Sequence, residues 1–358
     1  MTRWRALASS LVDALAARGV AVAPEWRAAF LAVPRHVFVP RFFVDAGGER
    51  LGGEVDATAP GRLREVYSDE PLVTRRRLVE RPGGGREYVA TSSSSQPTVI
   101  AIMLDLLDVG DGMRVLEVGT GTGYNAGLLC HRLGDEAVVS VDLDPELVAE
   151  ARERLAGIGH RPLLVAGDGT EGVAEGAPYD RVVVTCAVDT VHPAWIRQLA
   201  PGGRIVAPLV EGGALIVLDK TAPDRVEGRV DAECVFFMPL RPSLDSDDTE
   251  RHMWRQAAPD LPARPPELAP EAMGDIDFRL WLSLSIGHVE YLYDPDAPPA
   301  PTGRAGEPLD SAALSRSWRE FVAAGRPTRT RYGVTATTEG GWIWLDAPDS
   351  PHRWPLPL

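Results

Sequence analysis

The most regular hydrophobic pattern lies between residues 98 and 209, where short apolar runs alternate with longer amphipathic segments. A short apolar run bounded by turn residues is typical of a buried strand, and an amphipathic segment with helical spacing is typical of a helix. Regular alternation of the two predicts a parallel sheet, because each helix returns the chain to the edge where the next strand begins. The predicted strands are 114–118, 138–141, 163–166, 181–185 and 204–209.

Two further apolar stretches, 214–219 and 234–238, follow the last of these strands. They predict strands that close the sheet as an antiparallel edge. Residues 145–156 predict a helix, because Asp144 is a preferred N-cap residue and Glu146 favours the positive end of the helix dipole. The chain is therefore predicted to have an α/β fold with a mostly parallel, seven-stranded sheet.

The sequence before this region is less regular. Residues 3–18 and 24–32 have helical spacing. Pro34 and Pro40 bound a segment that should be extended or turned, because proline restricts its own backbone and that of the preceding residue. Residues 46–90 are rich in glycine, arginine and acidic residues, and they predict loops and short strands.

The sequence after residue 240 changes character again, with frequent prolines in 257–270 and 295–308. Apolar positions predict a helix over 311–324, and alternation predicts a strand over 342–345. The chain is thus expected to have three parts: an N-terminal helical and loop region (1–90), a central α/β domain (91–240) and a C-terminal α+β domain with an accessory or substrate-binding role (241–358).

Composition and charge narrow the possible partners. The chain has 37 basic and 51 acidic residues and a formal net charge of −14 at pH 7, so it lacks the positive surface that nucleic acids and anionic membranes attract. The widely spaced Cys130, Cys186 and Cys234 predict a reducing compartment, and no cysteine or histidine spacing predicts a bound metal. Without a signal peptide or membrane-spanning run, the expected location is the cytoplasm.

Residues 115–124, with the sequence VLEVGTGTGY, combine a buried strand with a glycine-rich turn and the start of a helix. Glycines at 119, 121 and 123 would let the backbone approach a nucleotide-like cofactor closely. The spacing is G-x-G-x-G, whereas dinucleotide-binding proteins usually have G-x-G-x-x-G. The motif therefore argues against NAD.

Acidic residues follow the next two predicted strands. Asp142 ends the second strand, where a carboxylate can accept hydrogen bonds from ribose hydroxyls. Asp168 follows the third strand, where it could meet an adenine amino group. Because ligands bind at the carboxyl ends of parallel strands, we expect both residues to join the glycine turn in one cofactor site. This combination resembles the S-adenosylmethionine-dependent methyltransferases of the Rossmann-like class.

Short motifs on both sides of this region narrow the resemblance. They are VPRHVFVP at 33–40, YSDEPL at 67–72, SSQP at 94–97, APYD at 177–180 and LAPGGR at 199–204. With these motifs in this order over about residues 30–240, the chain resembles the protein-L-isoaspartate O-methyltransferases. The resemblance implies methyl transfer from S-adenosylmethionine to a carboxylate of a protein or peptide, with S-adenosylhomocysteine as the product.

The resemblance also assigns roles to individual residues. The serine that the family places in its active site corresponds to Ser95, which is expected to orient the acceptor, and Ser93 and Gln96 are expected to line the cofactor. The chain departs from the family at Ser94, where the family has isoleucine, and in a longer arginine- and glycine-rich insert after Leu72. The other residues expected to bind the cofactor are Glu117, Gly119, Thr120, Gly121, Gly123, Asp142, Leu143, Asp168 and Gly169.

The serine run and the C-terminal extension resemble a variant group associated with ribosomally synthesised peptides such as lanthipeptides, graspetides or lasso peptides. This resemblance implies methylation of an aspartate side chain in a macrocyclic precursor peptide, with the ester leading to a succinimide or isoaspartate. Two alternatives remain open: general repair of L-isoaspartyl residues in damaged proteins, and a non-catalytic cofactor-binding scaffold. Arg75, Arg76, Arg77 and Arg81 could contact an acidic peptide, although arginine clusters are usually solvated.

Overall fold

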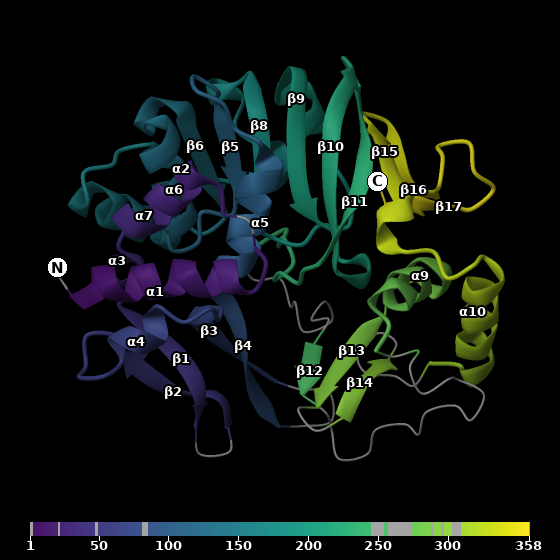
Figure 1. Cartoon of the computed structure of the whole chain (residues 1–358), viewed down its shortest axis with the longest axis horizontal. Coiled ribbons are helices and arrows are strands. Elements are labelled where there is room, and N and C mark those ends of the chain that lie inside the picture. Colours follow the sequence, from purple (N-terminus) through teal and green to yellow (C-terminus); the bar gives the residue numbers. More distant parts are fainter. Residues whose placement is uncertain are drawn as a thin grey trace. The chain divides into compact units, whose positions relative to one another are not determined.

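The chain folds as two compact units. The first contains Met1–Thr185 and Gln198–Val206, and the second contains Cys186–Arg197 and Ala207–Leu358. The start of the second unit thus precedes residue 241, the boundary that composition suggested for a C-terminal domain. The computed structural model describes residues 3–20, 22–46, 49–80, 85–244, 254–256, 272, 274–287, 289–294, 297–302 and 309–357 (Figure 1).

The predicted N-terminal helices are present. Helix α1 spans Arg3–Ala17 and helix α2 spans Pro24–Ala32, and the two pack against each other. The proline-bounded segment differs from the prediction, because it contains a short helix, α3, over Arg35–Phe38. Pro34 immediately precedes this helix, and its restricted backbone torsion is compatible with a helix start.

An antiparallel sheet of four strands, in the order β2-β1-β3-β4, occupies a region where loops and short strands were predicted. Arginines on the strands obscure the alternation of apolar and polar residues that would predict strands. Arg76 on β3 lies over the rings of Tyr88 and Phe43, with its guanidinium carbon 3.6 and 4.3 Å from the ring centroids, and so fills the place of an apolar side chain. The elements are β1 (Arg41–Ala46), β2 (Glu49–Asp56), α4 (Leu63–Val66), β3 (Leu72–Glu80) and β4 (Arg86–Ser94).

Five parallel strands, in the order β9-β8-β5-β6-β7, match the predicted strands and confirm the α/β class. The predicted helix cap is also present, because Asp144 accepts hydrogen bonds from the backbone N–H groups of Glu146 and Leu147. The strands are β5 (Val115–Val118), β6 (Val138–Asp142), β7 (Leu163–Ala166), β8 (Tyr179–Val184) and β9 (Leu199–Pro208). The helices are α5 (Pro97–Leu107), α6 (Tyr124–Leu133), α7 (Pro145–Gly157) and α8 (Pro193–Gln198).

Helices of the first unit pack against its parallel strands, and the carboxyl ends of these strands form the edge where the candidate site lies. Helices α6 and α7 pack on β6, α5 packs on β8, and α2 packs on α6 (Figure 1). The turns after neighbouring strands are joined directly, because Gly119 N–H donates to the Val141 carbonyl at 2.8 Å and Gly167 N–H donates to the Asp142 carbonyl at 2.9 Å. The carboxyl ends of β5, β6 and β7 therefore form one continuous edge.

The second unit contains antiparallel strands in the order β17-β16-β15-β11-β10. The strand predicted over 214–219 is β10, and the one predicted over 342–345 is β16. The strand predicted over 234–238 is wrong, because β11 ends where it was expected to begin; β11 is mostly polar, with only Val226 and Val230 buried. The strands are β10 (Ala214–Ala222), β11 (Arg225–Cys234), β15 (Tyr332–Thr337), β16 (Gly340–Leu345) and β17 (Arg353–Leu356).

Helices α9 (Ile276–Ile286) and α10 (Ser311–Ala323) pack together within this unit, and α10 confirms the predicted helix. The Phe278 ring centroid lies 4.8 Å from that of Trp318. A further sheet consists of β12 (Trp254–Gln256), β13 (Glu290–Asp294) and β14 (Ala297–Thr302). The proline-rich stretch 257–270 lies outside the described residues. Within the described parts of the chain, none of the helices has the length and apolar character needed to cross a bilayer.

Candidate active site

The glycine-rich turn between β5 and α6 has a backbone that favours glycine at each predicted position. Gly119, Gly121 and Gly123 have φ values of +99°, +51° and +87°, a region that residues with a side chain adopt at an energetic cost. At Gly123 a Cβ atom would also lie only 3.0 Å from the Ala151 Cβ on α7. The turn therefore needs these glycines both for its shape and for its contact with the neighbouring helix.

Asp142 fixes this turn from the end of β6. Its Oδ2 atom accepts a hydrogen bond from Gly121 N–H at 2.8 Å, and its Oδ1 atom accepts one from Asp144 N–H at 3.1 Å. The side chain is half-buried, so its carboxylate lies at the strand edge and also holds the turn there. Leu143, the next residue, is half-buried as well.

Glu117 is fully buried beneath the turn. Its Oε1 atom accepts from Asn125 Nδ2 at 2.7 Å and its Oε2 atom accepts from Ser140 Oγ at 2.6 Å. Ser140 Oγ also lies 2.6 Å from Thr120 Oγ1, so this network ties the glycine turn to β6. The geometry gives Glu117 a supporting role beneath the turn; direct contact of Glu117 or Thr120 with a cofactor stays a prediction.

The ionisation of Glu117 makes a testable contribution to stability. Burial, reinforced by the charge of Asp142, raises the pKa of Glu117 from 4.5 to about 7, despite the hydrogen bonds from Ser140 and Asn125 that favour ionisation. Between these two values the folded chain binds this proton more tightly than the unfolded chain, so the stability from this group is fully present below pH 4.5 and is lost as pH rises through 7. The full loss is about 3 kcal/mol.

The side chain in Glu117→Gln cannot ionise, so this variant should not lose stability as the pH rises. We expect the Tm of the variant, relative to that of the natural chain, to rise between about pH 4.5 and 8. Thermal unfolding of both proteins across this range measures the difference. If the Tm of the two proteins changed with pH in the same way, the raised pKa of Glu117 would be contradicted.

The end of β7 supplies the third predicted acidic residue. Asp168 is exposed, and its Oδ1 atom accepts from Thr170 N–H at 2.9 Å. This hydrogen bond begins a short 3₁₀ turn over Gly169–Glu171, in which Gly169 is buried. Asp142 and Asp168 therefore both lie at the carboxyl ends of strands, as predicted, and Asp168 faces solvent.

The serine segment approaches the glycine turn from the other side. The Ser93 carbonyl oxygen lies 3.6 Å from the place that a Cβ of Gly121 would occupy, so the end of β4 lies beside the turn. Ser95 is half-buried in the connection from β4 to α5. The Gln96 side-chain amide donates to the main-chain carbonyl of Asp69 at 3.1 Å and to its Oδ2 at 3.3 Å. Contact of these residues with substrate or cofactor stays a prediction.

Arg35 is a residue of this site that the sequence analysis missed. It is fully buried, and its guanidinium donates to the main-chain carbonyls of Val66, Ser68 and Glu70 on one side and of Ser94 and Ser95 on the other, at 2.9 to 3.4 Å. Burial lowers its pKa to about 10, so it remains charged at neutral pH. Its place in the motif VPRHVFVP was the available signal.

Arg35 also accounts for one departure from the family pattern. Its Nε–H donates to Ser94 Oγ at 3.3 Å, and Ser94 is buried. A hydroxyl in the place of an isoleucine therefore has a partner within the protein. The departure at Ser94 needs no substrate to explain it.

Asp69 is a second residue that the analysis missed, although it lies in the motif YSDEPL. Its carboxylate accepts from both Thr98 N–H and Thr98 Oγ1 at 2.8 Å, which satisfies one of the backbone N–H groups in the first turn of α5. It also forms an ion pair with Arg18 at 2.6 Å. Asp69 therefore links the 67–72 segment to the start of the helix that follows Ser95.

The arginines considered for peptide binding are partly engaged within the protein. Arg75 forms ion pairs with Asp144, Glu146 and Glu150, at 3.3, 3.0 and 2.6 Å. Arg76 donates to the Leu51 carbonyl in addition to its ring contacts. The suggested acidic-peptide contact is therefore not supported for Arg75 or Arg76, because their partners explain their presence; Arg81 lies outside the described residues.

The polar groups at this edge suit S-adenosylmethionine. Asp142 and Asp168 place carboxylates at the carboxyl ends of β6 and β7, the edge at which open parallel sheets bind their ligands. That they accept hydrogen bonds from ribose hydroxyls and an adenine amino group stays a prediction. The Oδ1 atom of Asn125, beside the glycine turn, is buried and has no hydrogen-bond partner among the described residues. A buried acceptor without a donor is costly, so a ligand that brings an N–H or O–H group would fit.

Comparison with known proteins identifies the family of the region that contains this site. The family Protein-L-isoaspartate(D-aspartate) O-methyltransferase matches residues 64–243, half of the chain. The protein-L-isoaspartate O-methyltransferase of Anaeromyxobacter dehalogenans is 41% identical over 186 residues, which cover 51% of this chain and 81% of that protein. The one from Thermococcus onnurineus is 34% identical over 200 residues, covering 55% of this chain and 76% of that protein.

A solved protein-L-isoaspartate O-methyltransferase shares the fold over more of the chain. It has a TM-score of 0.58 and 24% identity, and the match covers 95% of this chain and 100% of that one. The alignment with that structure therefore extends beyond residues 64–243, the part of the chain that the family match covers. The chain belongs to the protein-L-isoaspartate(D-aspartate) O-methyltransferase family, and it is an enzyme that uses S-adenosylmethionine.

Proposed function

We propose that the protein methylates the free carboxylate of L-isoaspartyl residues in proteins or peptides, as in general repair. The family match over residues 64–243 carries this proposal. It includes the glycine turn, Asp142, Asp168 and the serine segment, which together make up the candidate active site. The relatives that match this region are themselves protein-L-isoaspartate O-methyltransferases.

The chemistry makes modest demands on the protein. S-adenosylmethionine supplies a methyl group activated by a sulfonium. The acceptor carboxylate is already ionised at neutral pH, so no strong general base is needed. The protein's task is to hold one carboxylate oxygen in line with the methyl group. Ser95 would donate a hydrogen bond to the other oxygen, and Arg35 would hold the Ser95 backbone in place.

Ser95→Ala tests this orienting role. The variant should slow methyl transfer by about 10- to 100-fold, because a hydrogen bond to a charged group is worth about 1.5–3 kcal/mol. The Kd of S-adenosylmethionine should stay within about twofold, since the hydroxyl acts on the acceptor. Ser92→Ala, in the same serine run but on β4, is the matched control for single-turnover kinetics and calorimetry. An unchanged rate would remove Ser95 from the mechanism.

The second candidate is methylation of an aspartate side chain in a macrocyclic, ribosomally synthesised peptide, leading to succinimide or isoaspartate. The serine run favours it through the resemblance noted above. Its other support is weaker, because a protein-L-isoaspartate O-methyltransferase of similar fold covers 95% of this chain. The length beyond residue 243 is therefore compatible with repair as well as with peptide modification.

A pair of acceptors separates the two candidates. Synthetic peptides that differ only in carrying L-isoaspartate or L-aspartate at one position are prepared in linear and macrocyclic forms and incubated with methyl-labelled S-adenosylmethionine. Repair predicts transfer to the isoaspartyl peptide alone, measured as base-labile methyl ester. Turnover confined to aspartate in a macrocyclic peptide would favour the second candidate and exclude the first.

We also propose the cytoplasm as the compartment. None of the three cysteines forms a disulfide, which suits a reducing environment.

A further inference from the structure

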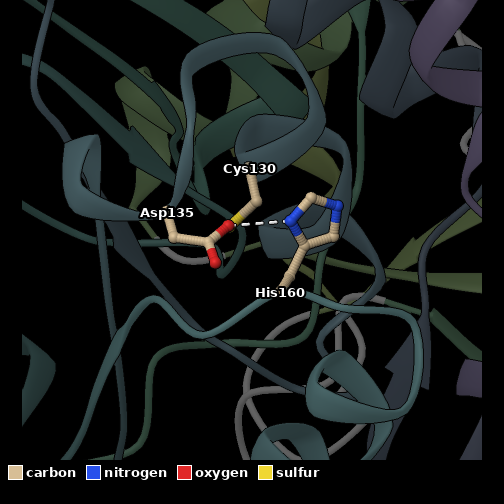
Figure 2. A group of neighbouring side chains, drawn as sticks. All are labelled: Cys130, Asp135 and His160. Atoms are coloured by element: carbon tan, nitrogen blue, oxygen red, sulfur yellow. Dashed lines mark hydrogen bonds and ion pairs between the residues drawn. The ribbon is translucent and has the colours of Figure 1, made fainter.

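Three side chains with different donor atoms meet away from the candidate active site. The Cys130 sulfur, an Asp135 carboxylate oxygen and a His160 ring nitrogen all lie within 4.8 Å of one another (Figure 2). His160 Nδ1 lies 2.7 Å from Asp135 Oδ1. No short sequence motif marks this cluster, because its members are separated along the chain and only the fold brings them together.

Regular structure holds each member of the cluster in place. Cys130 lies in the last turn of α6, and Asp135 begins the 3₁₀ turn Asp135–Ala137 that leads into β6. His160 follows α7, and its main-chain N–H donates to the Leu155 carbonyl at 2.9 Å. Arg161 N–H donates to Asp135 Oδ2 at 2.6 Å and orients the carboxylate. Such outer hydrogen bonds are typical of groups that ligate metals.

The cluster lies on the opposite edge of the sheet from the candidate active site. It precedes β6 and β7, so it belongs to the amino ends of these strands, whereas Asp142 and Asp168 follow their carboxyl ends. A ligand here would join the α6–β6 connection to the α7–β7 connection. It would not touch the cofactor site.

The donor set matches the preferences of zinc. Zinc binds cysteine sulfur, histidine nitrogen and carboxylate oxygen, and it can combine three protein ligands with one water. Cys130 is 2% exposed, but the His160 and Asp135 side chains are 21% and 30% exposed, which leaves a route for the ion and a place for water. A thiolate and a carboxylate would balance the two charges of Zn²⁺. The contact of 2.7 Å between His160 Nδ1 and Asp135 Oδ1 would need to widen by about 0.7 Å to fit a tetrahedral site.

We propose that Cys130, Asp135 and His160 bind one zinc ion that stabilises the first unit. On binding, the thiol proton passes to solvent and the sulfur forms a bond to the metal. In the metal-free chain Nδ1 carries a proton and donates it to Asp135 Oδ1. When the metal binds, this proton passes to solvent and Nε2 takes one up from solvent, so that Nδ1 presents a lone pair to the ion. The ion holds two loops of the folded chain that separate on unfolding, so it binds the folded state preferentially.

Titration of the metal-free natural protein with Co²⁺ tests the proposal, because cobalt reports thiolate ligands by a charge-transfer band. We expect one Co²⁺ per chain, a thiolate band, and displacement of Co²⁺ by Zn²⁺. Zinc should raise Tm by about 5 °C and leave the Kd of S-adenosylmethionine unchanged. Absence of the thiolate band in the natural protein would overturn the proposal without any variant.

Variants assign the ligands. Cys130→Ser should abolish the band, and Asp135→Asn and His160→Gln should each weaken Co²⁺ binding by about tenfold or more. Cys234→Ser, which alters a cysteine of the second unit, is the matched control and should bind like the natural protein. A band that persists in Cys130→Ser or disappears in Cys234→Ser would place the metal elsewhere and overturn the assignment.

Discussion

Arg35→Lys is expected to lower kcat for carboxyl methylation by about 100-fold while the Kd of S-adenosylmethionine changes by less than about threefold. The guanidinium donates to carbonyls of both the 66–70 segment and the Ser94–Ser95 segment. Lysine keeps the charge but has fewer donors in a different geometry, so it cannot hold both segments. A shift of about 1 Å in a positioning group can cost a factor of this size.

A second buried arginine provides the control for stability. Arg329 is 2% exposed and donates to main-chain carbonyls of Gly213, Glu233 and Ile276, all in the second unit. Arg329→Lys should lower Tm to a similar extent and leave kcat per folded molecule unchanged. Measurement of Tm, cofactor affinity and single-turnover rate on both variants separates positioning from stability. Equal loss of kcat in the two variants would refute a positioning role for Arg35.

Asp142→Ala is expected to weaken S-adenosylmethionine binding by about 100-fold, or about 2.7 kcal/mol. The substitution removes the carboxylate proposed to accept from the ribose. It also frees the N–H groups of Gly121 and Asp144, whose hydrogen bonds hold the glycine turn. S-adenosylhomocysteine should lose affinity by a similar factor, because it carries the same ribose. Calorimetry with both ligands measures the two effects.

Asp144→Asn is the matched control, because it alters a carboxylate two residues away and keeps an oxygen for the cap of α7. It loses charge toward Arg75 but should bind S-adenosylmethionine like the natural protein. Equal weakening by the two substitutions would indicate a general electrostatic effect in place of a specific contact. Unchanged binding by Asp142→Ala would remove Asp142 from the cofactor site.

The parallel sheet could be predicted because its signals are local. Short aliphatic strands, glycines in the turn and the Asp144 cap each act within a few residues, and the structure has them where the sequence placed them. The sheet over residues 41–94 could not be predicted in the same way. Arg75 is held by an ion pair with Glu150 on α7, and Arg76 packs on the ring of Tyr88 on β4. Because these partners lie on other elements of the chain, the polarity of the segment alone suggests a loop.

The same distinction divides the candidate site. The positions of Asp142 and Asp168 followed from strand ends alone. The burial of Glu117 and the role of Arg35 depend on partners from other segments, which a single sequence does not reveal. Strand β11 could not be predicted for a similar reason. Only Val226 and Val230 are buried in this mostly polar segment, and two such positions are too few to predict a strand.

The contacts of Arg35 have a consequence for how the enzyme can diverge. These hydrogen bonds join residues that are 31 to 60 positions apart in the sequence. The hydrogen bond from Gly121 to Asp142, which fixes the glycine turn, joins residues only 21 positions apart. The segment that carries Ser95 thus takes its shape from parts of the chain outside it. Substitutions in the 66–70 segment could reshape acceptor preference without altering any residue that meets the methyl donor. The shape of the acceptor segment and the shape of the glycine turn are thus set by different contacts.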